Sequence, residues 1–448
     1  MTETLIETDR RVTAFAELLG KLETRDAPAI RAFRERAMEN FVRLGFPSTK
    51  SEEWRYTNVQ PVARTDFRLP DGRREAVSRA TIAPVLLGDA ASAELVFVDG
   101  RFDPELSSTS PANGVDVMFL ADLFASPSAL LDEFLGRAAD PSTQPFVALN
   151  AALMRDGAVI RIHPGAIVEE PLHVVHVITT DARALPPMVN SRVLVIAEPG
   201  SQASIVESSW SAGGGRSFSN GVTEVFARAG AVIDHYRVQR ESAQAIHFSA
   251  LFIHEDRDAA VTTRAMDLGG ALVRNEVSVR LDGEGSSCSL DGLSLIDGSR
   301  HVDNQTRIDH LQPHTTSQEY YKGILDDTAR GVFDGRVVVH PGAQKTNARQ
   351  TNKNLLLSRD AIVDTKPTLE IYADDVKCNH GSTVGQLDED SIFYLRSRGI
   401  SLEESRKILT WAFASEIVQR IRLKTLREQL QNLLLERMPQ GTSEGALS

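Results

Sequence analysis

The sequence predicts a mainly β protein with helical ends. Short β-branched runs bounded by Gly, Pro or Asp recur from about residue 91 to about residue 380, with almost no helical segment between them. A βαβ sheet requires helices between its strands, and their near absence argues against that fold class. Four similar turn sequences also recur, and both ends of the chain carry helical periodicity. A β-helix is the first interpretation, and a large β-sandwich is the second.

The four turn sequences favour the β-helix. They are HPGA at 163–166, EPGS at 198–201, RAGA at 228–231 and HPGA at 340–343. A chain that turns at such positions, runs a short strand and turns again can stack its coils into a solenoid. The spacing is 35 residues from Gly165 to Gly200 and 30 from Gly200 to Gly230, so the repeat is not a strict one.

Periodicity divides the chain into three regions: 1–90, 91–385 and 386–448. The first is a helical N-terminal region whose second helix should end near Gly45. The middle region is the β core. In the helical C-terminal region, Ser401 with Glu404 three residues later forms the pattern of a capping box.

Composition excludes several function classes. A net charge of -12 over 448 residues argues against a general binder of nucleic acid or of anionic membranes. No window approaches the about 18 to 20 consecutive apolar residues of a membrane span. The N-terminus lacks the pattern of a signal peptide. We therefore expect a cytoplasmic protein.

Motifs of autonomous enzymes are absent from the sequence. There is no phosphate-binding G-x-x-x-x-G-K-[ST] loop, no dinucleotide fingerprint, no nucleophile elbow and no H-E-x-x-H zinc pair. With only two cysteines, Cys288 and Cys378, the chain cannot hold a zinc ion or a cluster by four thiolates of its own. We expect a protein that is not itself an enzyme and holds no cofactor tightly.

Cys378 and His380 form the most informative candidate site. The sequence TLEIYADDVKCNH reads as one strand, which would place both side chains in a row with Glu370, Tyr372 and Asp374. A thiolate and an imidazole two residues apart can reach one ion, yet they supply two of about four ligands that zinc or iron requires. The competing interpretation is a buried thiol beside a structural histidine, and spacing alone favours it.

Other candidates have simpler structural interpretations. His301, His310 and His314 lie close in sequence among acidic residues, but Pro313 prevents a helix from placing the last two on one face, and polar strand ends explain them better. We expect Cys288 to be a packing residue and Trp54 to be a core or docking residue. An apolar stripe in the C-terminal region predicts core or a subunit interface; it begins at Ile408, Leu409, Ala412 and Phe413.

Three segments resemble the SufB/SufD family of the SUF iron–sulfur cluster assembly system. They are SEEWRYTNV at 51–59, GVFDGRVVVHPGAQKTNARQTNKNLLLS at 331–358, and DTKPTLEIYADDVKCNHGSTVGQLDEDSIFYLRSRGIS at 364–401. The resemblance spans nearly the whole chain and is most specific from about 318 to 435. It is closer to the SufD branch than to SufB, whose expected upstream cysteine is missing from NARQTNKNLLLS.

The resemblance implies a right-handed parallel β-helix core between helical N-terminal and C-terminal regions. It implies a complex in which SufB pairs along the β-helix and the ATPase SufC docks on the C-terminal helices, including Ile408, Leu409, Ala412 and Phe413. Cys378 and His380 would hold transient iron or a nascent iron–sulfur cluster together with ligands of SufB, with His380 the stronger candidate. A homodimer in the absence of SufB, and contact with a flavin, are left open.

Two other function classes compete with this assembly scaffold. One is a β-helix carbohydrate-active enzyme that uses paired carboxylates such as Asp303 with Asp309, or Asp374 with Asp375. Consecutive acids on a strand point to opposite faces, which argues against the second pair. The other is a structural adaptor in which Cys378 and His380 have no metal role.

Overall fold

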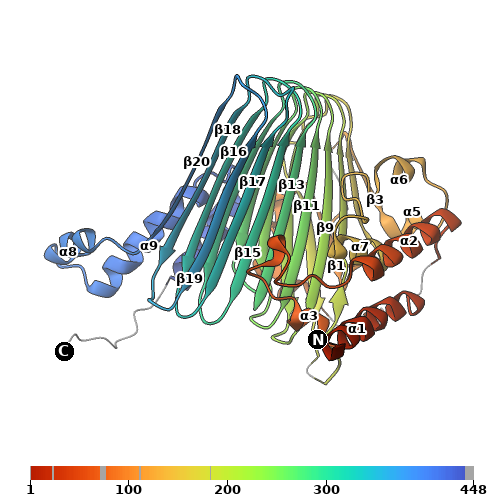
Figure 1. Cartoon of the computed structure of the whole chain (residues 1–448), viewed down its shortest axis with the longest axis horizontal. Coiled ribbons are helices and arrows are strands. Elements are labelled where there is room, and N and C mark those ends of the chain that lie inside the picture. Colours follow the sequence, from red (N-terminus) through yellow and green to blue (C-terminus); the bar gives the residue numbers. More distant parts are fainter. Residues whose placement is uncertain (1, 23–24, 71–76, 110–112, 182, 439–448) are drawn as a thin grey trace.

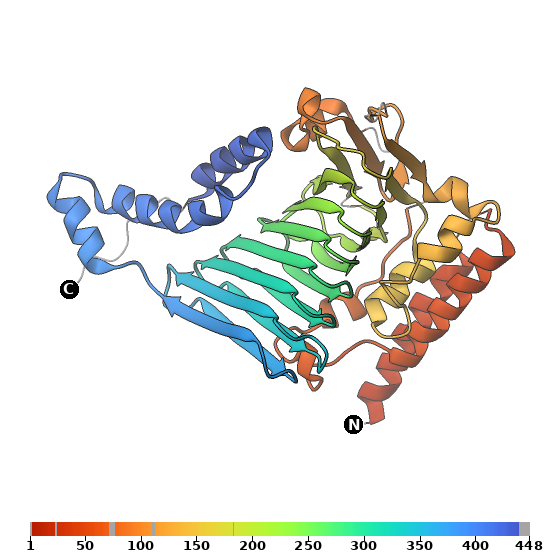
Figure 2. The same ribbon diagram turned by 90° about the horizontal axis from the view of Figure 1, so that it is seen from above.

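The computed structural model describes residues 2–22, 25–70, 77–109, 113–181 and 183–438. Two ten-stranded sheets face each other and form a parallel β-solenoid (Figures 1 and 2). Among the described strand pairs, only β1 with β2 and β3 with β4 are antiparallel. Parallel coils confirm the parallel β-helix prediction over the β-sandwich, whose strands would pair antiparallel.

The first sheet runs through the whole solenoid. In spatial order its strands are β2 (Arg101–Phe102), β1 (Ala93–Val98), β5 (Leu172–Thr179), β8 (Gln202–Ala212), β10 (Val232–Arg240), β12 (Ala260–Asp267), β14 (Ser287–Ile296), β16 (Thr316–Leu325), β18 (Asn347–Leu356) and β20 (Lys377–Gly385).

The second sheet begins at the same end of the solenoid as β20. Its strands are β19 (Ile362–Ile371), β17 (Arg330–Val339), β15 (His301–His310), β13 (Leu272–Leu281), β11 (Ile246–Glu255), β9 (Phe218–Ala227), β7 (Arg192–Ala197), β4 (Gly157–Ile162) and β3 (Val115–Phe119), with β6 (Met188–Val189) beside β9.

Helices precede, interrupt and follow the sheets. They are α1 (Thr2–Gly20), α2 (Pro28–Leu44), α3 (Gln60–Ala63), α4 (Arg79–Ile82), α5 (Leu120–Phe124), α6 (Ala129–Phe134), α7 (Pro145–Leu153), α8 (Glu389–Ser397), α9 (Leu402–Val418) and α10 (Lys424–Arg437), with short 3-10 turns η1 (Glu52–Trp54), η2 (Ala83–Val85) and η3 (Gly88–Ala90). No helix of the described residues is long and apolar enough to cross a membrane.

One corner of the solenoid explains three of the four recurring turn sequences. Gly165, Gly200 and Gly230 all have φ near 70° and stack in consecutive coils. Such a conformation favours glycine because a Cβ atom is disfavoured there. The amide of each donates to the next coil, from Gly165 to Pro199 and from Gly200 to Ala229, both at 2.9 Å. Residues in the same conformation continue this corner: Asp258, Gly285, His314 and Lys345.

Apolar side chains fill the space between the two sheets. Alternate residues of every strand point inward, so rows of similar side chains stack along the solenoid. Cys288 belongs to this core with 4% exposure, which confirms it as a packing residue. Buried polar groups also lie inside, and Glu319 of β16 is one of them.

The two outer faces are covered by different ends of the chain. The helices α1, α2 and α7 cover the second sheet, where Trp54 is buried in an aromatic cluster. The helices α9 and α10 cover the first sheet (Figure 2). The helix α2 is followed by Gly45, as predicted, and the Oγ of Ser401 accepts a hydrogen bond from the amide of Glu404, which confirms the N-cap of α9.

Glu319 provides a test of the buried interior. It is 1% exposed, its Oε2 accepts a hydrogen bond from Gln350 Nε2 at 2.5 Å, and burial raises its pKa from 4.5 to about 7. Between these two pKa values the folded chain keeps a proton that the unfolded chain loses. The protonated Glu319 carboxyl therefore contributes its full stabilisation of the fold below the unfolded pKa, and this contribution is lost as pH rises through the folded pKa.

We expect Glu319→Gln to become more stable than the wild type as pH rises from about 5 to about 7, by about 1.4 kcal/mol per pH unit and about 3 kcal/mol in total. The amide keeps the shape of the carboxyl and cannot ionise. Urea unfolding at several pH values measures the difference, with the exposed Glu284→Gln as a control. If the free energies of unfolding of the wild type and of Glu319→Gln changed in parallel with pH, the carboxyl of Glu319 would not be buried and protonated.

Candidate functional site

The last coil of the solenoid presents two strand edges. β20 ends the first sheet and β19 ends the second, and no described strand pairs with their outer edges. The amide of Lys377 donates to the carbonyl of Thr346 beside β18. Because amide directions alternate along a strand, the amides of Cys378, His380 and Ser382 point to the open edge.

Pro367 distinguishes the β19 edge from the β20 edge. The amides of Ile362 and Tyr372 donate toward β17, so position 367 has its nitrogen on the open side. Proline has no N–H to offer there, and prolines of this kind are typical of edge strands. β20 is therefore the edge with an uninterrupted row of donors. The sequence contained this signal, because a proline inside a strand pattern indicates an edge.

Cys378 and His380 lie on the inward side of β20. Cys378 is in register with Ala348 and packs against the end of the apolar core, whereas His380 is in register with Gln350 and is exposed. Burial raises the pKa of the Cys378 thiol. A raised pKa keeps the thiol protonated at neutral pH, so metal binding would have to displace its proton. This arrangement favours His380 as the more available ligand.

The predicted single strand through residues 368–380 is wrong. The chain leaves β19 after Ile371, turns, and enters β20 at Lys377. Glu370 remains on the outward side of β19, where its Oε1 lies 3.5 Å from Arg336 Nε. The carboxylates expected in one row with Cys378 and His380 are therefore on a different strand or in the turn.

The pair remains a two-residue site within this chain. Among the described residues, no group of three or more His, Cys, Asp or Glu side chains is placed to hold a metal ion. Ser382, the next inward residue of β20, is tied to Thr365 of β19 by a 2.9 Å hydrogen bond between hydroxyl oxygens. Cys378 and His380 thus lie on a coil that is braced internally and open at its edge.

The three histidines near Pro313 are not brought together. His301 and His310 are the first and last residues of β15, and His314 lies in the corner turn. His301 Nε2 is 2.9 Å from Thr57 Oγ1, and both ring nitrogens of His310 are 2.8 Å from hydroxyl oxygens. Burial lowers the pKa of His310 to about 4. His301 and His310 are therefore hydrogen-bonded structural histidines at strand ends, and His314 is an exposed residue of the turn.

The carboxylate pairs of a glycosidase are not supported by the geometry. Asp303 and Asp309 are six residues apart on one strand, or about 20 Å, whereas glycosidase carboxylates are about 5 to 9.5 Å apart. Asp303 binds Arg274 and Asp309 binds Arg307. Asp374 and Asp375 lie in the turn before β20, and Asp375 pairs with Lys345.

The C-terminal stripe divides between core and surface. α9 and α10 are separated at 419–423, and the later apolar residues are buried on the first sheet: Ile417, Ile421, Leu426, Leu430 and Leu434. Of the four residues predicted to bind a partner, Ile408 and Ala412 are exposed, and Leu409 and Phe413 are half-buried. Phe413 contacts the core, and its carbonyl accepts a hydrogen bond from Lys322 at 2.8 Å.

Family models match almost all of the chain. Residues 8–174 match the SufBD protein N-terminal region, and residues 177–413 match the SufBD core domain of SUF-system FeS cluster assembly. The chain is 31% identical over 404 residues to the iron–sulfur cluster assembly protein SufD of Escherichia coli, covering 90% of this chain and 92% of the relative.

Two further relatives agree with this match. A SufBD family protein of Synechocystis is 31% identical over 433 residues, covering 95% of this chain and 94% of the relative. SufD of Bacillus subtilis is 27% identical over 295 residues, covering 64% and 65%. The solenoid, the helical ends and these matches agree with one another, and the chain belongs to the SufB/SufD family of SUF-system iron–sulfur cluster assembly proteins, as a member of the SufD type.

Proposed function

We propose that this chain is a scaffold subunit of a cytoplasmic SUF complex, where it binds SufB through the open end of its solenoid and SufC through its C-terminal helices. Iron or a nascent cluster is the cargo, held at Cys378 and His380 together with ligands from SufB. The observation that carries this proposal is the position of the ligand pair. It lies on the last coil of the solenoid, whose edge strand β20 has no partner on its outer side within the described residues.

The exposed edge is suited to a protein partner. Unpaired strand edges readily accept another strand, and exposed apolar side chains flank this one. Ile371 and Val384 are 42% and 48% exposed, and Tyr372 is 61% exposed. Docking at this edge would bury these side chains and bring the partner's residues beside Cys378 and His380. When SufB is absent, a second copy of this chain offers the same edge, so a homodimer follows from the same surface.

The chain itself would be non-catalytic, with ATP hydrolysis on SufC. This division of labour is supported by the missing phosphate-binding loop. The helix α8 projects away from the solenoid and exposes Phe393 and Tyr394 by 74% and 57% (Figure 1). Ile408 and Ala412 of α9 are also exposed, so side chains of both helices are available to contact an ATPase subunit.

We expect Cys378→Ala and His380→Ala to lower the rate of iron–sulfur assembly by the complete complex by about tenfold or more, with His380→Ala the stronger, because each removes one of few cargo ligands. Partner binding should be unchanged. Asn379→Ala is the matched control, since this residue lies between them on the opposite face of β20. Wild-type rates in intact complexes would favour the structural adaptor instead.

We expect Ser382→Pro to weaken SufB binding by about tenfold or more, because it removes an outward amide from the β20 edge and leaves the ladder to β18 intact. Co-purification and size-exclusion chromatography measure the effect, and the same variant should abolish any homodimer. Ser382→Ala is the control, since it loses the hydroxyl and keeps the amide. Equal SufB binding by Ser382→Pro with native circular dichroism would exclude pairing at this edge.

We expect Ile408→Glu with Ala412→Glu to reduce SufC binding by about tenfold while SufB binding persists, because charges would enter an apolar contact. Leu435→Glu, on the 40% exposed Leu435 of α10, is the matched control. Pull-down with tagged SufC distinguishes the two helices. If only Leu435→Glu lost SufC binding, the ATPase contact would lie on α10 and not on α9.

A further inference from the structure

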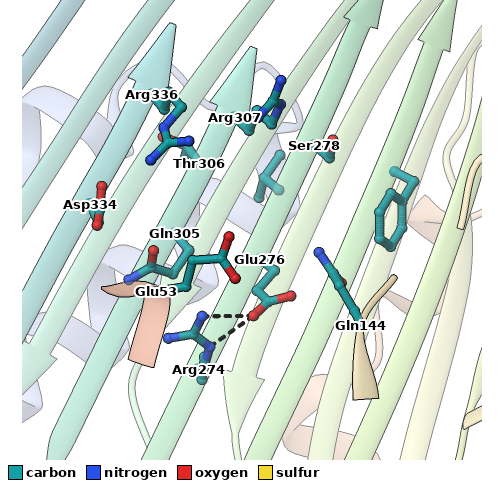
Figure 3. Close-up of a pocket in the computed structure, with 12 residues that line it drawn as sticks. Glu53, Gln144, Arg274, Glu276, Ser278, Gln305, Thr306, Arg307, Asp334 and Arg336 are labelled. Carbon is teal, nitrogen blue, oxygen red and sulfur yellow. Dashed lines mark hydrogen bonds and ion pairs between the residues drawn. The ribbon is translucent and has the colours of Figure 1, made fainter. Parts of the chain in front are cut away.

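A second site lies on the outward face of the second sheet. Cys378 and His380 are elsewhere, on the inward face of the first sheet. The second site is a cavity of about 110 Å³ between the sheet, the turn η1 and the residue that precedes α7 (Figure 3). Neither the resemblance nor the cluster-assembly proposal assigns it a role. Its volume suits a ligand of only a few non-hydrogen atoms, because sites for larger ligands are about 300 Å³ or more.

The floor of the cavity consists of two rows that run across the strands. Ser278, Arg307 and Arg336 are aligned in one row of β13, β15 and β17. Glu276, Gln305 and Asp334 are aligned in the neighbouring row. The two rows are two residues apart along each strand, or about 7 Å. The floor therefore has a cationic side and an acidic side.

The roof is held firmly over this floor. Glu53 of η1 and Gln144 reach over the two rows, and Figure 3 shows Glu53 beside Gln305 and Gln144 beside Glu276. The adjacent Trp54 is buried, and the Arg274 guanidinium carbon lies 3.7 Å from its ring centroid. The buried Trp54 thus anchors the backbone of η1 beside the sheet, which reduces the entropic cost of binding.

Several polar groups of the cavity are uncommitted. Within the described chain, Arg336 makes no hydrogen bond, and its nearest carboxylate oxygen, on Glu370, is 3.5 Å away. Glu53 forms no hydrogen bond or close ion pair with the described residues. Gln144 Oε1 is a buried atom without a hydrogen-bond partner in that same set. By contrast, Arg307 binds Asp309 at 2.7 and 2.8 Å and Glu276 binds Arg274 at 2.8 Å.

The charges that line the cavity cancel. Three arginines, Arg274, Arg307 and Arg336, face three carboxylates, Glu53, Glu276 and Asp334. A simple anion bound at the arginines would still lie near the carboxylates, and a simple cation bound at the carboxylates would lie near the guanidinium groups, so each would meet repulsion. A molecule that carries both charges can satisfy both rows at once.

We propose that this cavity binds a small zwitterion of the α-amino acid class. Its carboxylate lies against Arg307 and Arg336, which are neighbours in one row of the floor, and its ammonium group donates to Glu53 and to Gln144 Oε1. The cavity volume limits the ligand to amino acids with short side chains.

The test uses the full-length chain with glycine, L-alanine and L-serine as probes, by thermal shift and isothermal titration calorimetry. At about tenfold excess over Kd, binding should raise Tm by about 1 to 3 °C. Acetate, methylamine and phosphate, each with one kind of charge, should give no comparable shift. L-tryptophan is the control for size and should be excluded.

Variants locate the site. We expect Arg336→Gln and the exposed Glu53→Gln each to raise Kd for the best probe at least tenfold, whereas Arg280→Gln, an outward residue of β13 paired with Asp282, should leave it unchanged. The proposal is overturned if no small amino acid binds, if acetate or phosphate binds equally well, or if Glu53→Gln and Arg336→Gln both bind like the wild type. No partner subunit is needed, so this outcome is independent of cluster assembly.

Discussion

Backbone hydrogen bonding from each coil to the next is the constraint on which the rest of this structure depends. A coil in the middle of the solenoid has both edges of its strands paired, and its corner amide is also bound by the neighbouring coil. The two ends of the stack differ. At the N-terminal end, β2 and β3 are short antiparallel strands, and helices lie nearby. At the C-terminal end, the outer edges of β19 and β20 have no partner strand in the described chain. Their outward backbone groups therefore need hydrogen-bond partners from solvent or from another chain.

The same stacking allows polar groups inside the solenoid. Residues in register occupy one row, so a buried side chain meets its partner one coil away. His235 and Thr263 are held in this way at 2.9 Å, and Glu319 and Gln350 repeat the arrangement nearer the open end. Each pair is satisfied only in the native register. A slip of one residue would leave these groups buried without partners, so they specify the stacking as much as they stabilise it.

Local patterns in the sequence predict the elements well, and long-range register is what they miss. Turn glycines, β-branched runs and the Ser401 cap each depend on neighbouring residues, and all appear in the structure. The turn at 372–376 lacks both glycine and proline, so the sequence TLEIYADDVKCNH predicts one strand. The outward cavity leaves no local pattern for a different reason. Arg307 and Arg336 are neighbours because one coil of the solenoid separates them. The irregular spacing of the turns means that the length of this coil does not follow from the sequence.

The candidate site is incomplete in two respects, and both occur at one place. β20 has a row of amides without acceptors in the described chain, and beside it Cys378 and His380 would supply only two of the about four ligands that iron needs. Under the proposed function, one partner strand would complete both the ladder and the ligand set. Ladder pairing also restricts where the partner's ligands can lie, because a shift of one residue turns every side chain of the strand to the opposite face. Strand pairing would then select the partner and orient its ligands in a single step, before any cargo arrives.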